Sequence, residues 1–188
     1  MPSHEIALAR HGDTEWSRDL RHTGRTDIPL TAKGRRQASE LGARLAGRRF
    51  DKVLVSPLSR AVETCELAGL GRHAERRPEL LELDYGEAEG LTTAQLREHV
   101  PGWTVWTHET PGAETLEQVG ARLEPLVAEL RATDGDVAVF AHGHVLRVLA
   151  ALWIDLSPRG GARLALATGT LSALGWEHDT QVIRTWNA

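Results

Sequence analysis

The stretch Leu8-Ala9-Arg10-His11-Gly12-Asp13-Thr14-Glu15-Trp16 passes directly from an apolar run into a polar cluster. The run from Ile6 to Ala9 predicts a short buried strand, and the residues after it predict a loop at the carboxyl end of that strand. Open α/β sheets bind ligands at this end. At this end, Arg10 can bind an anion and His11 can act as a nucleophile or base. Gly12 lets a ligand approach the backbone closely. The stretch therefore indicates both the fold class and the position of a site.

Length and composition limit the classes of protein to consider. The chain has 188 residues, of which 41% are hydrophobic and 26% charged, with a net charge of -4. We expect one domain over residues 1–188 with one core. The lack of a basic block argues against a nucleic-acid partner, and no stretch approaches the roughly 18 apolar residues of a membrane span. With the single cysteine Cys65 and no leader pattern, these features predict a cytoplasmic protein without nucleic-acid or membrane partners.

Strand and helix signals alternate along the rest of the chain. Further strands are predicted at residues 51–55, 73–81, 136–140, 162–167, 171–176 and 182–186. Helices are predicted at residues 32–45, 58–67, 93–100, 116–130 and 145–153, three of them after threonine N-caps. The long polar stretch 18–30 predicts a functional loop. This order predicts an α/β three-layer sandwich, in which a mostly parallel central sheet with a hairpin near one edge is flanked by helices.

Parallel strands bring the loops at their carboxyl ends together. Loops follow the predicted strands that end at Ala9, Val55 and Phe140. A carboxylate from the acidic segment around Glu82 is expected near them. The predicted fold thus gathers side chains that are far apart in sequence, namely Arg10, His11, Arg60, Glu82 and His142.

This set of side chains suits phosphoryl transfer. Two permanently charged arginine forks match the oxygens of a phosphate dianion. With no Cys or Ser similarly placed, the imidazole of His11 is the candidate nucleophile. A protonated His142 can donate to a phosphoryl oxygen, and a protonated Glu82 can protonate the leaving group and later activate water. None of these steps needs a metal.

Other interpretations of the same residues remain. A zinc site from His11, His142 and His144 is possible in principle, although two arginines would repel a cation. Because Glu82 lies in an acidic run, a solvated charged surface is an alternative to its catalytic role. His144 is expected to start a helix, and His22 either contacts substrate or faces water. For Trp103 and Trp106, a lid over the pocket and an anchor for a long loop are both left open.

Four motifs in the same order as in a known family extend this interpretation. They are Arg10-His11-Gly12-Asp13-Thr14, Ser56-Pro57-Leu58-Ser59-Arg60-Ala61, Leu81-Glu82-Leu83-Asp84-Tyr85-Gly86 and Ala141-His142-Gly143. Together they resemble the motifs of the histidine phosphatase superfamily, whose fold is called phosphoglycerate mutase-like, over essentially the whole chain. The resemblance implies a phosphohistidine at His11 and a proton donor at Glu82. It also implies that further residues contact substrate, namely Arg10, Gly12, Thr14, Ser17, Arg21, Thr23, Gly24, Arg60, Tyr85 and Gly143.

The resemblance also separates branches of the family. Mutases carry a basic pair after the proton donor that holds a bisphosphorylated cofactor, and no such pair lies between Glu89 and Glu114. Ser17 stands where the family commonly has Asn. The expected function is therefore that of a metal-independent phosphomonoesterase, of the acid or sugar-phosphate type, acting on a small phosphorylated metabolite without a cofactor. A mutase and a non-catalytic phosphometabolite-binding domain are the alternatives, and a homodimer is left open.

Overall fold

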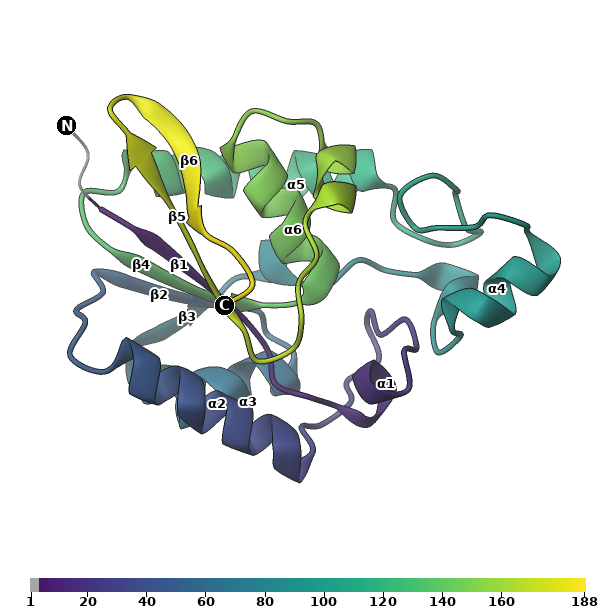
Figure 1. Ribbon diagram of the computed structural model, residues 1–188, viewed down its shortest axis with the longest axis horizontal. Helices are drawn as coiled ribbons and strands as arrows, with labels where there is room; N and C mark the ends of the chain where they lie inside the picture. The colour runs from purple at the N-terminus through teal and green to yellow at the C-terminus, as the bar shows by residue number, and fades with distance from the viewer. Residues whose placement is uncertain (1–3) are drawn as a thin grey trace.

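The computed structural model, which describes residues 4–188, contains a sheet with the strand order β3-β2-β4-β1-β5-β6 (Figure 1). Its strands are β1 (Ile6–Arg10), β2 (Lys52–Val55), β3 (Ala74–Arg76), β4 (Val137–Ala141), β5 (Leu171–Glu177) and β6 (Thr180–Thr185). The first four run parallel. β5 pairs antiparallel with β1 and forms a hairpin with β6 at the edge. The predicted mostly parallel sheet with an edge hairpin is confirmed.

Helices cover both faces of this sheet, with α2 and α3 on one side and α5 and α6 on the other (Figure 1). The α-helices are α1 (Glu15–Arg18), α2 (Ala32–Leu45), α3 (Ser59–Leu67), α4 (Thr93–His99), α5 (Leu116–Ala132) and α6 (Gly143–Trp153). Short 3-10 helices occur at η1 (Gly71–His73), η2 (Pro78–Leu80), η3 (Gly86–Ala88) and η4 (Pro158–Arg163). The predicted N-caps Thr31, Thr92 and Thr115 each accept a backbone N–H bond in the first turn, which explains where α2, α4 and α5 begin.

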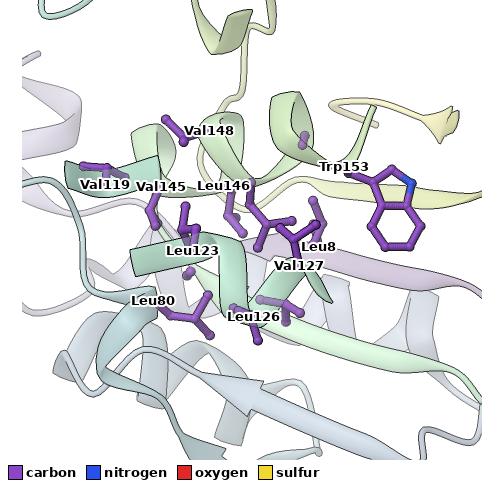
Figure 2. Packing of buried hydrophobic residues seen from close by; sticks show 14 of the residues in the cluster. Leu8, Leu80, Val119, Leu123, Leu126, Val127, Val145, Leu146, Val148 and Trp153 are labelled. Atoms are coloured by element: carbon purple, nitrogen blue, oxygen red, sulfur yellow. The ribbon is translucent and has the colours of Figure 1, made fainter. Parts of the chain in front are cut away.

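The sheet has a separate hydrophobic core on each face, where sequence predicted one core, because the side chains of β1 alternate between the two faces. Ile6 and Leu8 face α5 and α6, whereas the small Ala7 and Ala9 face α2 and α3. Figure 2 shows Leu8 among the aliphatic side chains of α5 and α6. Because both faces of a parallel sheet are covered, its strands are apolar at nearly every position rather than at every second one.

Three predicted elements differ from the structure. The strand predicted at 73–81 ends after three residues, because Pro78 cannot donate to the ladder and instead begins η2. The strand predicted at 162–167 is wrong. The place beside β1 is taken by β5, and the segment runs past the end of β1, where the Arg10 side chain donates to the Leu166 carbonyl. The loop predicted after the first strand contains the single turn α1, which is too short to show helical periodicity.

The carboxyl ends of β1, β2 and β4 point toward the side of the molecule where α1 and α4 lie (Figure 1). The loops that carry the predicted site residues therefore share one end of the sheet, as expected for an open α/β fold. Within residues 4–188, every helix is too short or too polar to cross a membrane.

Candidate active site

A cavity of about 460 Å³ opens at this end of the sheet. Its size suits a small-molecule ligand. Seven of the predicted site residues line it, namely Arg10, His11, Ser17, Arg21, Thr23, Glu82 and Tyr85. The remaining lining residues are Asp19, Leu20, His22, Thr92, Thr93, Ala94 and His144. Arg60 and His142, which were predicted to meet the substrate, are fully buried and are not among the residues that line this cavity.

The His11 imidazole is held in one tautomer. Its Nδ1 lies 2.8 Å from the Gly12 carbonyl oxygen, which can only accept, so Nδ1 carries the proton and Nε2 keeps a lone pair. Burial and the charges of Arg60 and Arg10 lower the pKa of His11 well below 6.5. Only 4% of the residue is exposed. The ring is therefore neutral and oriented at neutral pH, which is the state that a histidine nucleophile requires.

Arg10, which lines the same cavity as His11, has a buried N–H group without a hydrogen-bond partner in the part of the chain that the structure describes. One terminal nitrogen donates to the Leu166 carbonyl, while Nε is buried and has no hydrogen-bond partner in residues 4–188. A Cβ on Gly143 would lie 3.1 Å from the Arg10 guanidinium carbon, so glycine lets the guanidinium rest on the N-terminus of α6. Burial lowers the pKa of Arg10, and Glu82 and Tyr85 oppose that shift. An unpaired cationic donor at a helix N-terminus is suited to an anion.

Arg60 and His142 form a buried hydrogen-bonded pair next to His11. Arg60 Nε donates to His142 Nδ1 at 3.1 Å, so the proton of a neutral His142 ring is on Nε2, which donates to Ser56 Oγ at 2.7 Å. The His142 ring centroid lies 5.1 Å from that of His11. Burial, then Arg60, lower the pKa of His142 well below 6.5. In this environment, without a bound phosphate, the neutral form of His142 is favoured over the protonated form expected from sequence, and its ring is bonded to Arg60.

The rest of the Arg60 guanidinium binds the loop between α1 and α2. Its terminal nitrogens donate to the carbonyl oxygens of Thr23, Gly24 and Thr26, at 2.9 to 3.3 Å. The buried arginine therefore orders the loop that carries the predicted substrate contacts. Burial lowers the pKa of Arg60, whereas Glu82 and Asp27 raise it.

Glu82 lies at the N-terminus of α6. Its Oε1 accepts the backbone N–H groups of Leu83 and Val145 at 3.0 and 2.9 Å, and its Oε2 accepts that of His144 at 3.0 Å. The carboxylate completes the first turn of the helix that follows His142, which is a reason for this residue to be acidic apart from any catalysis. It also lines the cavity, as His11 does, whereas other acidic residues of the same run, Glu79, Asp84, Glu87 and Glu89, do not.

Several predicted substrate contacts have partners within the protein. The space predicted beside Gly12 is filled, since a Cβ there would lie 2.3 Å from the carbonyl oxygen of Gly34 in α2. The hydroxyls of Thr14 and Ser17 form the capping box of α1. The N–H of Gly24 donates to Glu89. These residues shape the loop walls, while Arg21 lies at the cavity with its guanidinium carbon 5.9 Å from the Trp16 ring.

A cluster of rings forms a wall that sequence reasoning only partly identified. Tyr85 Oη lies 2.5 Å from His144 Nδ1, and the His22 ring lies 4.9 Å from that of Tyr85 and 5.1 Å from that of Trp103. Burial lowers the pKa of His22 to about 4. Trp103 is buried in the core and anchors its loop, whereas the Trp106 ring lies 5.2 Å from the His144 ring at an interplanar angle of 42°. In the sequence, this cluster of rings could have been predicted from His144, the second histidine of Ala141-His142-Gly143-His144.

The side chains do not assemble the alternative zinc site. Across residues 4–188 no three His, Cys, Asp or Glu side chains are placed to hold one metal ion together. His142 is instead occupied by Arg60 and Ser56, and His144 by Tyr85.

Known proteins resemble this chain over nearly its whole length. A sequence model of the histidine phosphatase superfamily, branch 1, matches residues 6–188. An acid phosphatase of Mycobacterium tuberculosis is 41% identical over 183 residues, which cover 95% of this chain and 90% of the relative. A 2,3-bisphosphoglycerate-dependent phosphoglycerate mutase of Brucella ovis is 36% identical over 186 residues, which cover 89% of each. The solved structure of an open reading frame product from Mycobacterium tuberculosis superimposes with a TM-score of 0.93 at 39% identity, covering 98% of this chain and 97% of the other.

Proposed function

The chain belongs to the histidine phosphatase superfamily, branch 1, and from that premise we propose that it hydrolyses small phosphate monoesters through a phosphohistidine on His11. The observation that carries the proposal is the His11 ring, whose Nδ1 is bonded to the Gly12 carbonyl so that Nε2 keeps its lone pair in the cavity. The unpaired Arg10 Nε and the α6 N-terminus lie beside it. The acid phosphatase relative supports the same activity.

The first step forms the covalent intermediate. The lone pair of His11 Nε2 attacks phosphorus in line, and the bond from phosphorus to the ester oxygen breaks. Arg10 and the helix N-terminus balance the negative charge on the phosphoryl oxygens. Glu82, the cavity-lining acid of its segment, acts in the substrate complex as a carboxylic acid: the ester oxygen leaves with its proton, and Glu82 becomes the carboxylate that the second step uses. Burial and the charges of Arg60 and Arg10 lower the pKa of His11, and the negative charge of the bound phosphate acts in the opposite direction.

The second step releases phosphate. Water attacks the phosphorus of the phosphohistidine and gives a proton to Glu82, while the bond from phosphorus to His11 breaks and returns the lone pair to Nε2. In this scheme Arg60 and His142 act from outside the cavity lining. His142 fixes the Arg60 guanidinium, and Arg60 orders the loop through the carbonyls of Thr23, Gly24 and Thr26.

Phosphate release from p-nitrophenyl phosphate and a panel of sugar phosphates, in the presence of EDTA, tests the proposal. We expect activity in the wild type, none in His11→Ala, and wild-type activity in the matched control His73→Ala, whose side chain is exposed and outside the cavity. Enzyme quenched with detergent at alkaline pH should carry a base-stable phosphate that is released by later acid treatment, and only when His11 is present. Wild-type turnover in His11→Ala would refute the phosphohistidine route.

A mutase is the second candidate, because the Brucella ovis relative named above is a mutase. The segment between Glu89 and Glu114 opposes it, since it contains no Lys and a single Arg, Arg97, which donates to the Trp103 carbonyl at 2.9 Å. The discriminating assay adds 2,3-bisphosphoglycerate to 3-phosphoglycerate. We expect slow release of inorganic phosphate, whereas rapid formation of 2-phosphoglycerate would favour the mutase.

A further inference from the structure

His144 lines the cavity, yet the two steps above do not use it. Burial raises the pKa of Tyr85 well above 10, so its phenol keeps its proton, and the only acceptor for that proton in residues 4–188 is His144 Nδ1 at 2.5 Å. The proton of the neutral His144 ring is therefore on Nε2. This second nitrogen is the one that can reach a ligand.

His144 Nε2 is a free donor. It has no hydrogen-bond partner within residues 4–188, and it is not enclosed, because the buried side-chain atoms without a partner there are Arg10 Nε and Arg131 Nε. The ring is held by its neighbours, with centroids 5.2 Å from Trp106 and 5.7 Å from Tyr85. Burial, then the charge of Arg147, lower the pKa of His144 well below 6.5, so the donor is uncharged at neutral pH.

The position of the ring relates it to one side of the substrate. The His144 backbone N–H donates to Glu82 Oε2, and the ring Nδ1 lies 3.9 Å from the same oxygen. Since Glu82 is the proposed donor to the ester oxygen, His144 stands on the leaving-group side of the cavity. On that side, the uncharged N–H of His144 suits a hydroxyl oxygen, whereas a phosphate oxygen is bound more strongly by a charged donor.

We propose that His144 determines specificity by donating its Nε2–H to a hydroxyl oxygen on a carbon next to the ester carbon of the leaving group. The favoured substrates are then polyol and sugar phosphates rather than simple alkyl phosphates. Tyr85 acts through His144 as a positioning residue, because its hydroxyl selects the Nε2–H tautomer. This inference rests on the proposed function and adds a substrate class to it.

Two esters that share one carbon skeleton test the inference. Glycerol 2-phosphate carries a hydroxyl on each carbon beside the ester carbon, whereas isopropyl phosphate carries none. The readout is the ratio of kcat/KM for glycerol 2-phosphate to that for isopropyl phosphate. Loss of one neutral hydrogen bond in His144→Leu should lower this ratio by about threefold to tenfold.

Further variants separate recognition from structure. His144→Gln keeps an amide N–H near the position of Nε2 and should recover most of the ratio. Tyr85→Phe frees the tautomer and should lower the ratio by a smaller factor. His73→Leu makes the same exchange as His144→Leu at an exposed position and should leave the ratio unchanged.

The outcomes are distinct. An equal loss for both esters in His144→Leu and His144→Gln would mean that His144 serves only the structure or the chemical step, and would overturn the inference. An unchanged ratio in all the folded variants would also overturn it. If the wild type hydrolyses neither these esters nor p-nitrophenyl phosphate, the proposed function fails, and the inference fails with it.

Discussion

Replacing Glu82 with glutamine separates two roles that the structure gives to one carboxylate. The side chain caps α6 by accepting the N–H groups of Leu83, His144 and Val145, and it lines the cavity as the proposed proton donor. Glutamine has nearly the same shape. Its amide group, however, brings two donors to a place where three donors already converge, and it removes the negative charge at the helix N-terminus.

The loss of stability follows from these contacts. At least one charge-assisted bond, worth about 1.5–3 kcal/mol, is lost because the amide nitrogen cannot accept. The missing charge at the helix terminus adds about 0.3–1 kcal/mol. We therefore expect Glu82→Gln to lower the free energy of unfolding by about 2–4 kcal/mol. For a chain of this length, each kcal/mol corresponds to about 2–4 °C in Tm, so the Tm should fall by at least about 4 °C.

Thermal unfolding and steady-state kinetics check both roles. Glu117→Gln is the control, since Glu117 also lies in the first turn of a helix but is exposed and pairs only with Arg159 at the surface, at 3.0 Å. It should change stability by less than about 0.5 kcal/mol. In Glu82→Gln, kcat for a sugar phosphate should fall by about 10²- to 10⁴-fold, and less for p-nitrophenyl phosphate, whose leaving group needs no proton. A Tm within 1 °C of wild type, or equal losses for both substrates, would refute the reasoning.

Three other changes have expected outcomes. Gly12→Ala places a Cβ 2.3 Å from the Gly34 carbonyl oxygen, and this clash of two backbones should cost about 1–3 kcal/mol in urea unfolding, whereas a wild-type midpoint would show that the crossing can open. Trp153→Ala removes a fully buried ring that donates to the Gly175 carbonyl and should cost about 3–5 kcal/mol; a loss below 1 kcal/mol would contradict the packing. The pKa of His22 is about 4 in the fold and near 6.5 when unfolded, so between these values the unfolded chain binds more protons. Stability should therefore fall as pH decreases from about 6.5 toward 4, by up to about 1.4 kcal/mol per pH unit from this residue, and His22→Leu should flatten that slope.

The elements best predicted from sequence are those whose signals are local. Thr92 with Gln95 and Thr115 with Gln118 form the expected capping boxes, because the bonds involved span only three residues. Strand content depended on distant partners. Residues 162–167 have strand-like composition but lie past the end of β1, where the neighbouring position belongs to β5. A local sequence pattern cannot show which of two segments will pair with β1.

The candidate site also has features that could be predicted from sequence and features that depend on residues distant in sequence. Sequence alone determined which groups meet, because Arg10, His11, Arg60 and His142 follow or flank the ends of strands that a parallel sheet must align. It also indicated His11 as the candidate nucleophile, since no Cys or Ser is similarly placed. Only the tertiary structure decided what each group does there. The proton positions of His11 and His144 depend on the Gly12 carbonyl and the Tyr85 hydroxyl. Arg60 and His142 are hydrogen-bonded to each other, and Arg60 also binds carbonyl groups of a loop distant in sequence. Hydrogen-bond direction, burial and the electrostatic field at a side chain depend on its three-dimensional neighbours. The residue types at the strand ends, in contrast, can be seen directly in the sequence.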